Sequence, residues 1–158
     1  MAITVHPSAI IDKGAKIGDG SRIWHFVHVC GGAVIGKNVS MGQGVFVGNK
    51  VTIGDNCKIQ NNVSIYKGVT IGDNVFIGPS VVFTNDLYPD ARRWTEENIV
   101  STQVMNGVSI GANSTIICGI VLYEGCLIGA GSVVTNDIQS GKIAYGNPAK
   151  EIKNYNTF

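Results

Sequence analysis

The stretch from Val5 to Phe83 decides the fold, because a large apolar residue returns in it at every sixth position. Its middle, residues 45–62, reads Val-Phe-Val-Gly-Asn-Lys, Val-Thr-Ile-Gly-Asp-Asn, Cys-Lys-Ile-Gln-Asn-Asn. A second column of small or β-branched residues follows four positions after the first. Helices repeat every 3.6 residues and strands every two, so neither explains a period of six. A hexapeptide repeat predicts a parallel β-helix, an all-β fold that takes residues 1–158 as one domain.

Three hexads are expected to close one triangular coil of 18 residues, so that residues 18 apart stack on each other. Side chains alternate across a strand, so one residue of each hexad points outward between the two inward columns. The most apolar of the three outer faces carries Ile10, His28, Phe46, Ser64 and Val82. We expect this face to pack against another subunit, and a closed threefold assembly suits a triangular prism.

Two segments depart from the repeat. From Thr84 through Gly107 the pattern is lost, which predicts an extruded loop over about residues 84–107. Loops of this length are usually functional or disordered. The pattern resumes at Ile110, and if the loop re-enters on the next face, Val121 is expected to extend the apolar face. After Tyr145 the repeat ends, and a short polar tail over residues 146–158 is expected.

The corners that border the apolar face carry large polar or aromatic residues where simple turn residues would suffice, which suggests a site there. One corner column contains Trp24, His25, Phe26, Gln43, Asn61 and Asn62, and the other contains Asn49, Tyr66, Lys67, Thr84 and Asn85. Asn49, Lys67 and Asn85 are expected to lie directly above one another.

The amino-acid composition indicates which classes of partner and which cellular compartment are expected. A net charge of +1 with 15% charged residues gives no basic patch, so no nucleic-acid partner is expected. No apolar run approaches the roughly 18 residues needed to span a bilayer, and the N-terminus does not resemble a signal peptide. The four cysteines fall in the small column or at corners, without metal-type spacing. A reduced, cytoplasmic protein is expected.

Several strings longer than the bare hexad carry a resemblance. They are His-Pro-Ser-Ala-Ile-Ile (6–11), Ile-Trp-His-Phe-Val-His-Val (23–29), Gly-Gln-Gly-Val-Phe-Val-Gly-Asn (42–49), Lys-Ile-Gln-Asn-Asn-Val-Ser-Ile-Tyr (58–66) and Val-Phe-Thr-Asn-Asp (82–86). They resemble the hexapeptide-repeat acyltransferases, and most closely the N-acetyltransferases of nucleotide-linked 3-amino sugars for surface polysaccharides such as lipopolysaccharide. The resemblance implies a left-handed β-helix, a homotrimer, acetyl-CoA as cosubstrate, no required metal, and a UDP- or dTDP-linked amino sugar.

Asn85 matches the asparagine that the family places beside the reacting amine, where it would orient the amine through a hydrogen bond. His25 and His28 are the candidate bases because imidazole titrates near neutral pH. They could equally be packed at the subunit contact. The resemblance leaves a dedicated base unnecessary.

The remaining site residues divide into two groups. The substrate group is Gln43, Asn61, Asn62, Tyr66, Lys67, Thr84 and Arg92. Amide side chains could read the nucleotide or simply form corner ladders, and Arg92 or Lys67 could bind phosphate or a sugar carboxylate. The resemblance assigns acetyl-CoA to Gly111, Ala112, Gly129, Ala130, Lys142, Pro148 and Lys150, although turn packing would also explain the glycines.

Other functions stay open. A hexapeptide-repeat carbonic anhydrase would need His6, His25 and His28 to converge on a metal. A non-catalytic β-helix, such as an ice-binding or scaffold protein, would show regular polar ladders. An acetyltransferase for a 4-amino sugar, serine or an antibiotic is the nearer competitor. The residues do not distinguish UDP from dTDP, or a uronate from a 6-deoxy sugar.

Overall fold

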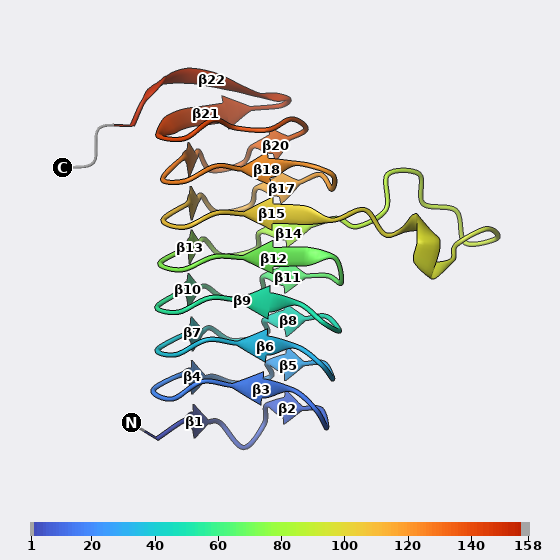
Figure 1. The fold of residues 1–158 in the computed structure, drawn as a ribbon, viewed down its shortest axis with the longest axis vertical. Helices are drawn as coiled ribbons and strands as arrows, with labels where there is room; N and C mark the ends of the chain where they lie inside the picture. Colours follow the sequence, from blue (N-terminus) through green and yellow to red (C-terminus); the bar gives the residue numbers. More distant parts are fainter. Residues whose placement is uncertain (1, 156–158) are drawn as a thin grey trace.

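The computed structural model describes residues 2–155, and in it the chain winds into a column of stacked triangular coils (Figure 1). One long loop projects from a corner of the column at the level of strands β14 and β15, and a hairpin closes the C-terminal end. Each coil contributes one short strand to each of three parallel sheets, which we name A, B and C in the order in which the chain visits them.

Sheet A contains β1 (Thr4–Val5), β4 (Arg22–Ile23), β7 (Ser40–Met41), β10 (Lys58–Ile59), β13 (Phe76–Ile77), β16 (Ser109–Ile110), β19 (Leu127–Ile128), β21 (Lys142–Gly146) and β22 (Ala149–Asn154). Sheet B contains β2 (Ile10–Ile11), β5 (His28–Val29), β8 (Phe46–Val47), β11 (Ser64–Ile65), β14 (Val82–Phe83), β17 (Thr115–Ile116) and β20 (Val133–Val134). Sheet C contains β3 (Lys16–Ile17), β6 (Val34–Ile35), β9 (Thr52–Ile53), β12 (Val69–Ile71), β15 (Thr102–Val104) and β18 (Val121–Leu122).

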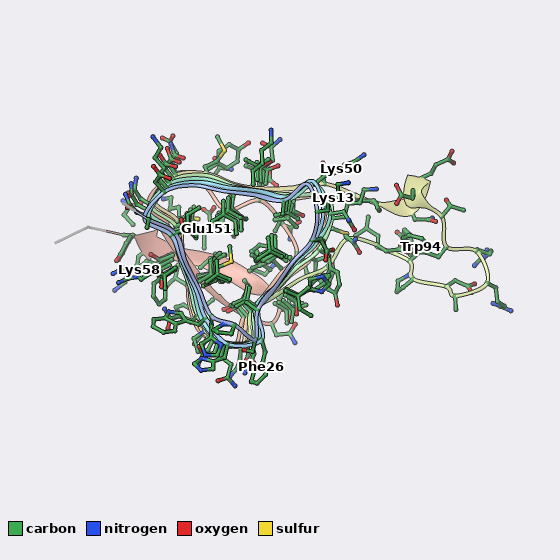
Figure 2. The ribbon with its side chains drawn as sticks, turned by 90° about the horizontal axis from the view of Figure 1, so that it is seen from below. Lys13, Phe26, Lys50, Lys58, Trp94 and Glu151 are labelled. Atoms are coloured by element: carbon green, nitrogen blue, oxygen red, sulfur yellow. The ribbon has the colours of Figure 1, made fainter. Side chains whose placement is uncertain are left out.

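The coils wind in a left-handed sense, as the resemblance implied. Figure 2 views the column from its N-terminal end, with sheet A on the side of Lys58 and the corner of Phe26 between sheets A and B. The chain passes from sheet A to Phe26, along sheet B to the corner of Lys13 and Lys50, and back along sheet C. This path runs counter-clockwise as the coils recede from the viewer, which defines a left-handed helix.

Both inward columns form one continuous core, which confirms the hexad interpretation. Residues 18 apart pair in register before the loop, as in Ser40 with Lys58 and Lys58 with Phe76. The small column (for example Val45, 1% exposed) and the large column (for example Ile65, 0% exposed) are buried together. Like therefore stacks on like from coil to coil, and each coil can bury its apolar edge only against its neighbours.

Coil stacking also explains the corner residues between sheets C and A. A Cβ atom on Gly54 would lie 2.6 Å from the carbonyl carbon of Gly72 in the next coil, so only glycine permits this stacking distance. Asn38, Asn56 and Asn74 occupy the third corner position with φ of 55°, 58° and 57°. Asparagine tolerates this left-handed region better than most residues, which is why it recurs there.

The extruded loop is shorter than the sequence predicted. The repeat resumes at β15, whose Thr102 and Val104 point into the core, so the loop spans residues 84–101 rather than 84–107. Val104 lies six positions before Ile110 and continues the large column. The residues around it are polar, so the sequence pattern did not identify Val104 as part of the repeat. A short 3-10 helix, η1 (Glu96–Asn98), lies within the loop. No helix in residues 2–155 is long and apolar enough to cross a membrane.

Two further expectations need correction. The polar tail expected over residues 146–158 contains β22, which pairs with β21 in an antiparallel hairpin that covers the last coil, and residues 156–158 lie outside the described residues. Val121 belongs to sheet C, where it pairs with Gln103, so it does not extend the apolar face. Sheet B instead continues with Thr115 and Val133, because the loop re-enters on sheet C and the order of faces is kept.

The buried thiols give the core a testable pH dependence. Cys126 is fully buried, and burial raises the pKa of its thiol from 9.0 to about 12. Below pH 9 this thiol is protonated in both states, but above it the unfolded chain ionises first, so the free energy of unfolding falls as pH rises. We expect Cys126→Ala to reduce this fall between pH 9 and 11 by up to about 1.4 kcal/mol per pH unit, measured by urea unfolding. Parallel curves for the two proteins would contradict the burial of a protonated thiol.

Candidate active site along the two edges of sheet B

Asn85 occupies the point where the long loop leaves the column, at the corner that follows β14. Its side-chain Nδ2 donates a hydrogen bond of 3.1 Å to the carbonyl oxygen of Lys67, one coil below. Its own carbonyl oxygen accepts a hydrogen bond of 2.9 Å from the backbone N–H of Val100, on the returning arm of the loop. These contacts fix the amide and confirm the predicted stacking of Lys67 and Asn85. With Nδ2 engaged, Oδ1 remains as the acceptor that a substrate amine could use.

Lys67 ties the loop to the column. Its ammonium group forms an ion pair with Glu96 in η1, and this hydrogen bond holds the pKa of the Glu96 carboxyl below its usual value. The side chain of Lys67 is 27% exposed and that of Glu96 is 71% exposed, so solvent weakens the pair. Sequence analysis missed Glu96, because nothing in the loop sequence shows which residue returns to the corner.

Tyr66 and Thr84 complete this corner. The ring of Tyr66 lies 5.4 Å from that of Phe46 in the coil below, centroid to centroid, and Tyr66 is 43% exposed. The hydroxyl of Thr84 accepts a hydrogen bond of 3.0 Å from the backbone N–H of Cys118. We call Tyr66, Lys67, Thr84, Asn85 and the loop the loop edge of sheet B.

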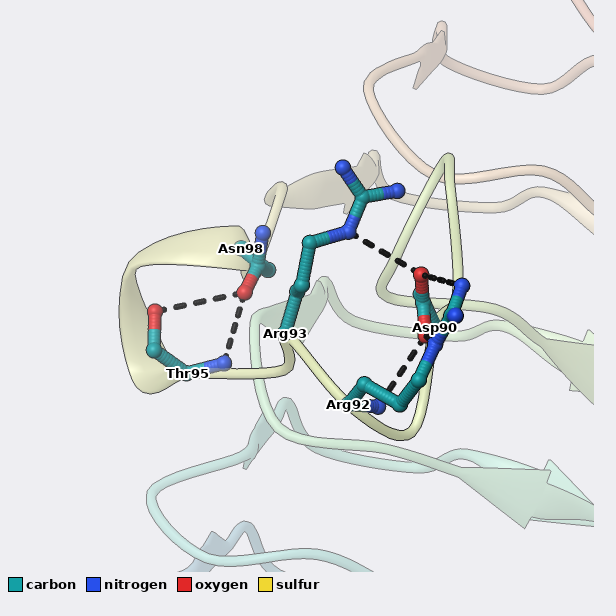
Figure 3. Close-up of polar contacts among 5 residues, drawn as sticks. All are labelled: Asp90, Arg92, Arg93, Thr95 and Asn98. Atoms are coloured by element: carbon teal, nitrogen blue, oxygen red, sulfur yellow. Dashed lines mark hydrogen bonds and ion pairs between the residues drawn. The ribbon is translucent and has the colours of Figure 1, made fainter.

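The outer part of the loop is organised by Asp90 (Figure 3). Arg92 donates to both carboxylate oxygens of Asp90, at 3.1 Å each, and Arg93 Nε donates to Oδ2 at 3.0 Å. The hydrogen bonds from Arg92 hold the pKa of the Asp90 carboxyl below its usual value. Arg92 is therefore engaged with Asp90, although its side chain is 86% exposed and could turn to an anionic ligand.

A hollow in the loop lies beside this cluster. It is lined by Asp86, Tyr88, Asp90, Arg93, Trp94 and Asn98. It combines two aromatic rings with hydrogen-bonding groups of both kinds, which is the chemistry that holds a planar heterocycle. Asn98 itself is held by Thr95, whose backbone N–H donates to the amide oxygen of Asn98 at 2.6 Å (Figure 3).

The opposite edge of sheet B, at the corner that follows sheet A, holds the second group of predicted residues. A shallow hollow is lined there by Trp24, His25, Ser40, Gly42, Gln43, Ile59, Gln60 and Asn61. The ring of His25 lies 3.6 Å from that of His6, centroid to centroid, and His28 is on the sheet face and not with them. A metal-dependent carbonic anhydrase would require the three histidines to converge on one metal ion, and within one chain they do not.

The two asparagines of this corner, Asn61 and Asn62, form hydrogen bonds that connect neighbouring coils. Asn61 Oδ1 accepts a hydrogen bond of 3.0 Å from the backbone N–H of Gln43, one coil below. The backbone N–H of Asn62 donates to the carbonyl oxygen of Gln43 at 2.8 Å, and Asn62 adopts a φ of 58°. The corner ladder considered from the sequence is thus present, while Gln43 is exposed and lines the hollow.

Higher on the same corner, an apolar groove runs along sheet A. It is lined by Phe76, Ser109, Ile110, Gly111, Leu127, Ile128, Gly129 and Ala130. A Cβ atom on Gly111 would lie 2.5 Å from the backbone nitrogen of Ala130, so coil stacking alone requires glycine there. We call this groove, with Ala112 and the hollow around His25, the groove edge of sheet B.

The last predicted residues lie at the C-terminal end. Lys142 begins β21, and its Nζ donates a hydrogen bond of 2.7 Å to Asn154 Oδ1. Pro148 lies in the hairpin turn, and Lys150 lies in β22. Pro148 and Lys150 are exposed, and Lys142 is half-buried. Lys150 pairs with Tyr145, which contacts Gly129 of the apolar groove, whereas Lys142 lies at the far end of β21 from the groove.

The three predicted catalytic residues do not meet within one chain. His28 lies on β5 and Asn85 follows β14, with β8 and β11 between these strands in sheet B. Three strand spacings separate the residues by about 14 Å, too far for proton transfer from an amine held at Asn85. His25 lies on the opposite edge. Asn85 is therefore the only one of the three at the base of the loop.

Profiles of known families match most of the column. The bacterial transferase hexapeptide repeat matches residues 14–49 and 50–85, and the hexapeptide repeat of succinyl-transferase matches residues 32–67 and 106–136. Among curated relatives, the dTDP-3-amino-3,6-dideoxy-alpha-D-galactopyranose 3-N-acetyltransferase of Aneurinibacillus thermoaerophilus is 56% identical over 151 residues, which cover 96% of this chain and 77% of the relative.

Solved structures show the same fold. The N-acyltransferase AntD of Bacillus cereus, in complex with dTDP and 3-hydroxybutyryl-CoA, is 23% identical with a TM-score of 0.69, over 97% of this chain and 83% of that one. A galactoside acetyltransferase in complex with coenzyme A is 30% identical with a TM-score of 0.68, over 79% of this chain and 66% of that one. From the repeat matches and the 56% identity together, the chain belongs to the hexapeptide-repeat transferases, in the family of the Aneurinibacillus sugar-nucleotide N-acetyltransferase.

Proposed function

We propose that the protein transfers an acetyl group from acetyl-CoA to the 3-amino group of a dTDP-linked 3-amino-dideoxyhexose, for use in a surface polysaccharide. The 56% identity to a dTDP-3-amino-sugar N-acetyltransferase, extending over both edges of sheet B, carries the proposal. A loop hollow that pairs aromatic rings with arginine suits a nucleotide, and an apolar groove floored by stacked glycines suits a thin pantetheine arm.

The reaction needs a neutral amine in line with a thioester. The amine nitrogen attacks the thioester carbonyl carbon, the C–N bond forms, the C–S bond breaks, and the departing thiolate takes up the proton that the nitrogen loses. Asn85 Oδ1 accepts a hydrogen bond from the amine and so directs its lone pair toward the carbonyl. Positioning of this kind supplies a large part of the rate enhancement in many bimolecular transfers.

The two half-sites support a homotrimer. The loop edge and the groove edge flank sheet B on opposite sides, so a nucleotide bound at one and a coenzyme arm bound at the other cannot meet across a single chain. Outward residues of sheet B between these edges carry no lysine, arginine or carboxylate; they are Ile10, His28, Phe46, Ser64, Val82, Thr115 and Val133. Closing three copies around this face places the loop edge of one beside the groove edge of the next.

A thiol-release assay with acetyl-CoA tests the proposed reaction. The acceptors are dTDP- and UDP-linked sugars that carry the amine at C3 or at C4. We expect release with the dTDP-linked 3-amino sugar to exceed that with every other acceptor. Release only with a 4-amino acceptor would show that the substrate is a 4-amino sugar and not the proposed 3-amino sugar. No release with any acceptor would overturn the proposal.

A mixed-subunit experiment tests the shared site. Asn85→Ala removes the loop-edge residue, and Ala130→Trp places a large side chain in the groove, where Ala130 is exposed. Each variant alone is expected to keep at most about a tenth of wild-type activity. Co-expressed as differently tagged chains, they should recover up to about a quarter of wild-type activity, because random assembly restores one intact pairing of edges in four. Mixed trimers as inactive as their parents would show that one chain holds the whole site.

A further inference from the structure

A second polar cluster lies on the first two coils, far from Asn85. Asp12 follows β2 at the corner between sheets B and C, and Cys30 occupies the equivalent corner position one coil above. The backbone N–H groups of Asp12 and Cys30 are bonded to the carbonyl oxygens of Val29 and Val47, at 3.0 and 2.9 Å, which fixes both corners. His28 precedes Cys30 by two residues, so strand alternation turns both side chains toward the same side as Asp12.

The donor atoms of these three side chains are close together. His28 Nε2 lies 3.2 Å from Asp12 Oδ1 and 3.9 Å from Cys30 Sγ, and all three ligand atoms lie within 4.8 Å of one another. Tetrahedral zinc with bonds of 2.0 to 2.3 Å separates a nitrogen ligand from an oxygen by about 3.3 Å and from a sulfur by about 3.6 Å. The nitrogen–oxygen distance already matches, and the nitrogen–sulfur distance must shorten by a few tenths of an ångström.

We propose that Asp12, His28 and Cys30 form a binding site for a divalent transition metal of the zinc class. Carboxylate, imidazole and thiolate are the three side-chain ligand types that Zn²⁺ accepts. Binding replaces the thiol proton of Cys30, which is released to solvent, and uses the lone pair on His28 Nε2. No other group of three such ligands comes together in the part of the chain that the structure describes, residues 2–155.

The surroundings favour a metal over a loose ion pair. Within a single chain, Cys30 is 7% exposed, while the side chains of His28 and Asp12 are 38% and 41% exposed, so the sulfur is buried and the other two ligands lie at the surface of the chain. The ring of Phe46 stands edge-on to His28 at 5.8 Å and limits its rotation.

The position of the site indicates its role. The core residues of the first coil, Ala9, Ile11, Ala15 and Ile17, are only partly buried, because within residues 2–155 no coil packs beneath them. A metal held by Asp12 from the first coil and by His28 and Cys30 from the second would clamp these coils together. The binding free energy then adds to the stability of the column. This role is independent of acetyl transfer, because three strand spacings separate His28 from Asn85.

Titration of chelator-treated protein with Co²⁺ and Zn²⁺ tests the site. Co²⁺ is expected to give a thiolate-to-metal charge-transfer band with one ion per chain, and Zn²⁺ to displace it and raise the melting temperature. Cys30→Ala should abolish the band, and Asp12→Asn should weaken binding by more than about tenfold. Cys118→Ala is the matched control, a buried cysteine at the same corner higher in the column. It should bind like the wild type.

Two results would overturn the proposal. The first is wild-type protein that shows no charge-transfer band at excess Co²⁺, a measurement that needs no variant and no assumption about folding. The second is equal metal binding by wild type and Cys30→Ala, which would assign the metal to the neighbouring histidines His6 and His25. Circular dichroism of each variant confirms that the column has formed before titration.

Discussion

Asn85→Ala is expected to lower kcat for acetyl transfer by about 10- to 100-fold while leaving KM for the sugar nucleotide nearly unchanged. A hydrogen bond to a charged group contributes about 1.5 to 3 kcal/mol, and the amine nitrogen gains positive charge as it attacks the thioester. Each 1.4 kcal/mol is a factor of ten in rate. The nucleotide, held in the loop, would still bind, but its amine would no longer be directed at the thioester. Steady-state thiol release with the dTDP-linked 3-amino sugar measures both constants.

Asn49→Ala supplies the matched control. Asn49 Nδ2 donates to the carbonyl oxygen of Gly31 at 3.3 Å, the same contact between coils that Asn85 makes with Lys67, but two coils below the loop. It therefore loses the same structural hydrogen bond without touching the reacting amine, and its kcat should stay within about twofold of wild type. If both variants lose activity equally, the effect is structural and Asn85 does not orient the amine.

Phe83→Ala is expected to reduce the free energy of unfolding by about 3 to 5 kcal/mol. Phe83 is fully buried and stacks between Ile65 in the coil below and Ile116 in the coil above. No neighbouring side chain can fill the space, because each is held in its own coil by backbone pairing. Urea unfolding followed by circular dichroism measures the change, and the transition midpoint should fall without a large change in its slope.

Phe76→Ala, one strand earlier in the chain, tests whether burial is the cause. Phe76 points outward from sheet A and is 40% exposed, so its removal leaves no internal cavity. We expect a loss of less than about 1 kcal/mol, with a weaker affinity for acetyl-CoA because Phe76 lines the groove. Equal destabilisation by the two variants would contradict the inward and outward assignment of these strands.

The hexad pattern allowed most of the column to be predicted. It identified the inward columns, the three faces, the corner glycines and the point at which the loop departs, because a period of six leaves one way to bury every large residue. It failed where the pattern is weakest. Val104 was absorbed into the loop, and the strand Ala149–Asn154 was taken for a polar tail, because its partner is antiparallel and outside the repeat.

The candidate site divides in the same way. The sequence alone placed Lys67 beneath Asn85 and the glycines of the groove edge above one another, since residues 18 apart must stack when each coil closes in three hexads. It did not reveal that Glu96 returns to Lys67, that Asp90 holds both Arg92 and Arg93, or that Asp12 lies beside His28.

What the sequence determined by itself is therefore the part of this protein governed by periodicity: the all-β column, its core and its corners. Only the tertiary structure decided which charged residues pair and how the loop folds back. Hydrogen-bond partners across a loop or between neighbouring corners are residues that only the folded chain brings close together. A sequence repeat does not specify which residues these are. The burial pattern is repeated in every hexad of the chain and can therefore be recognised, whereas each of these polar contacts occurs only once.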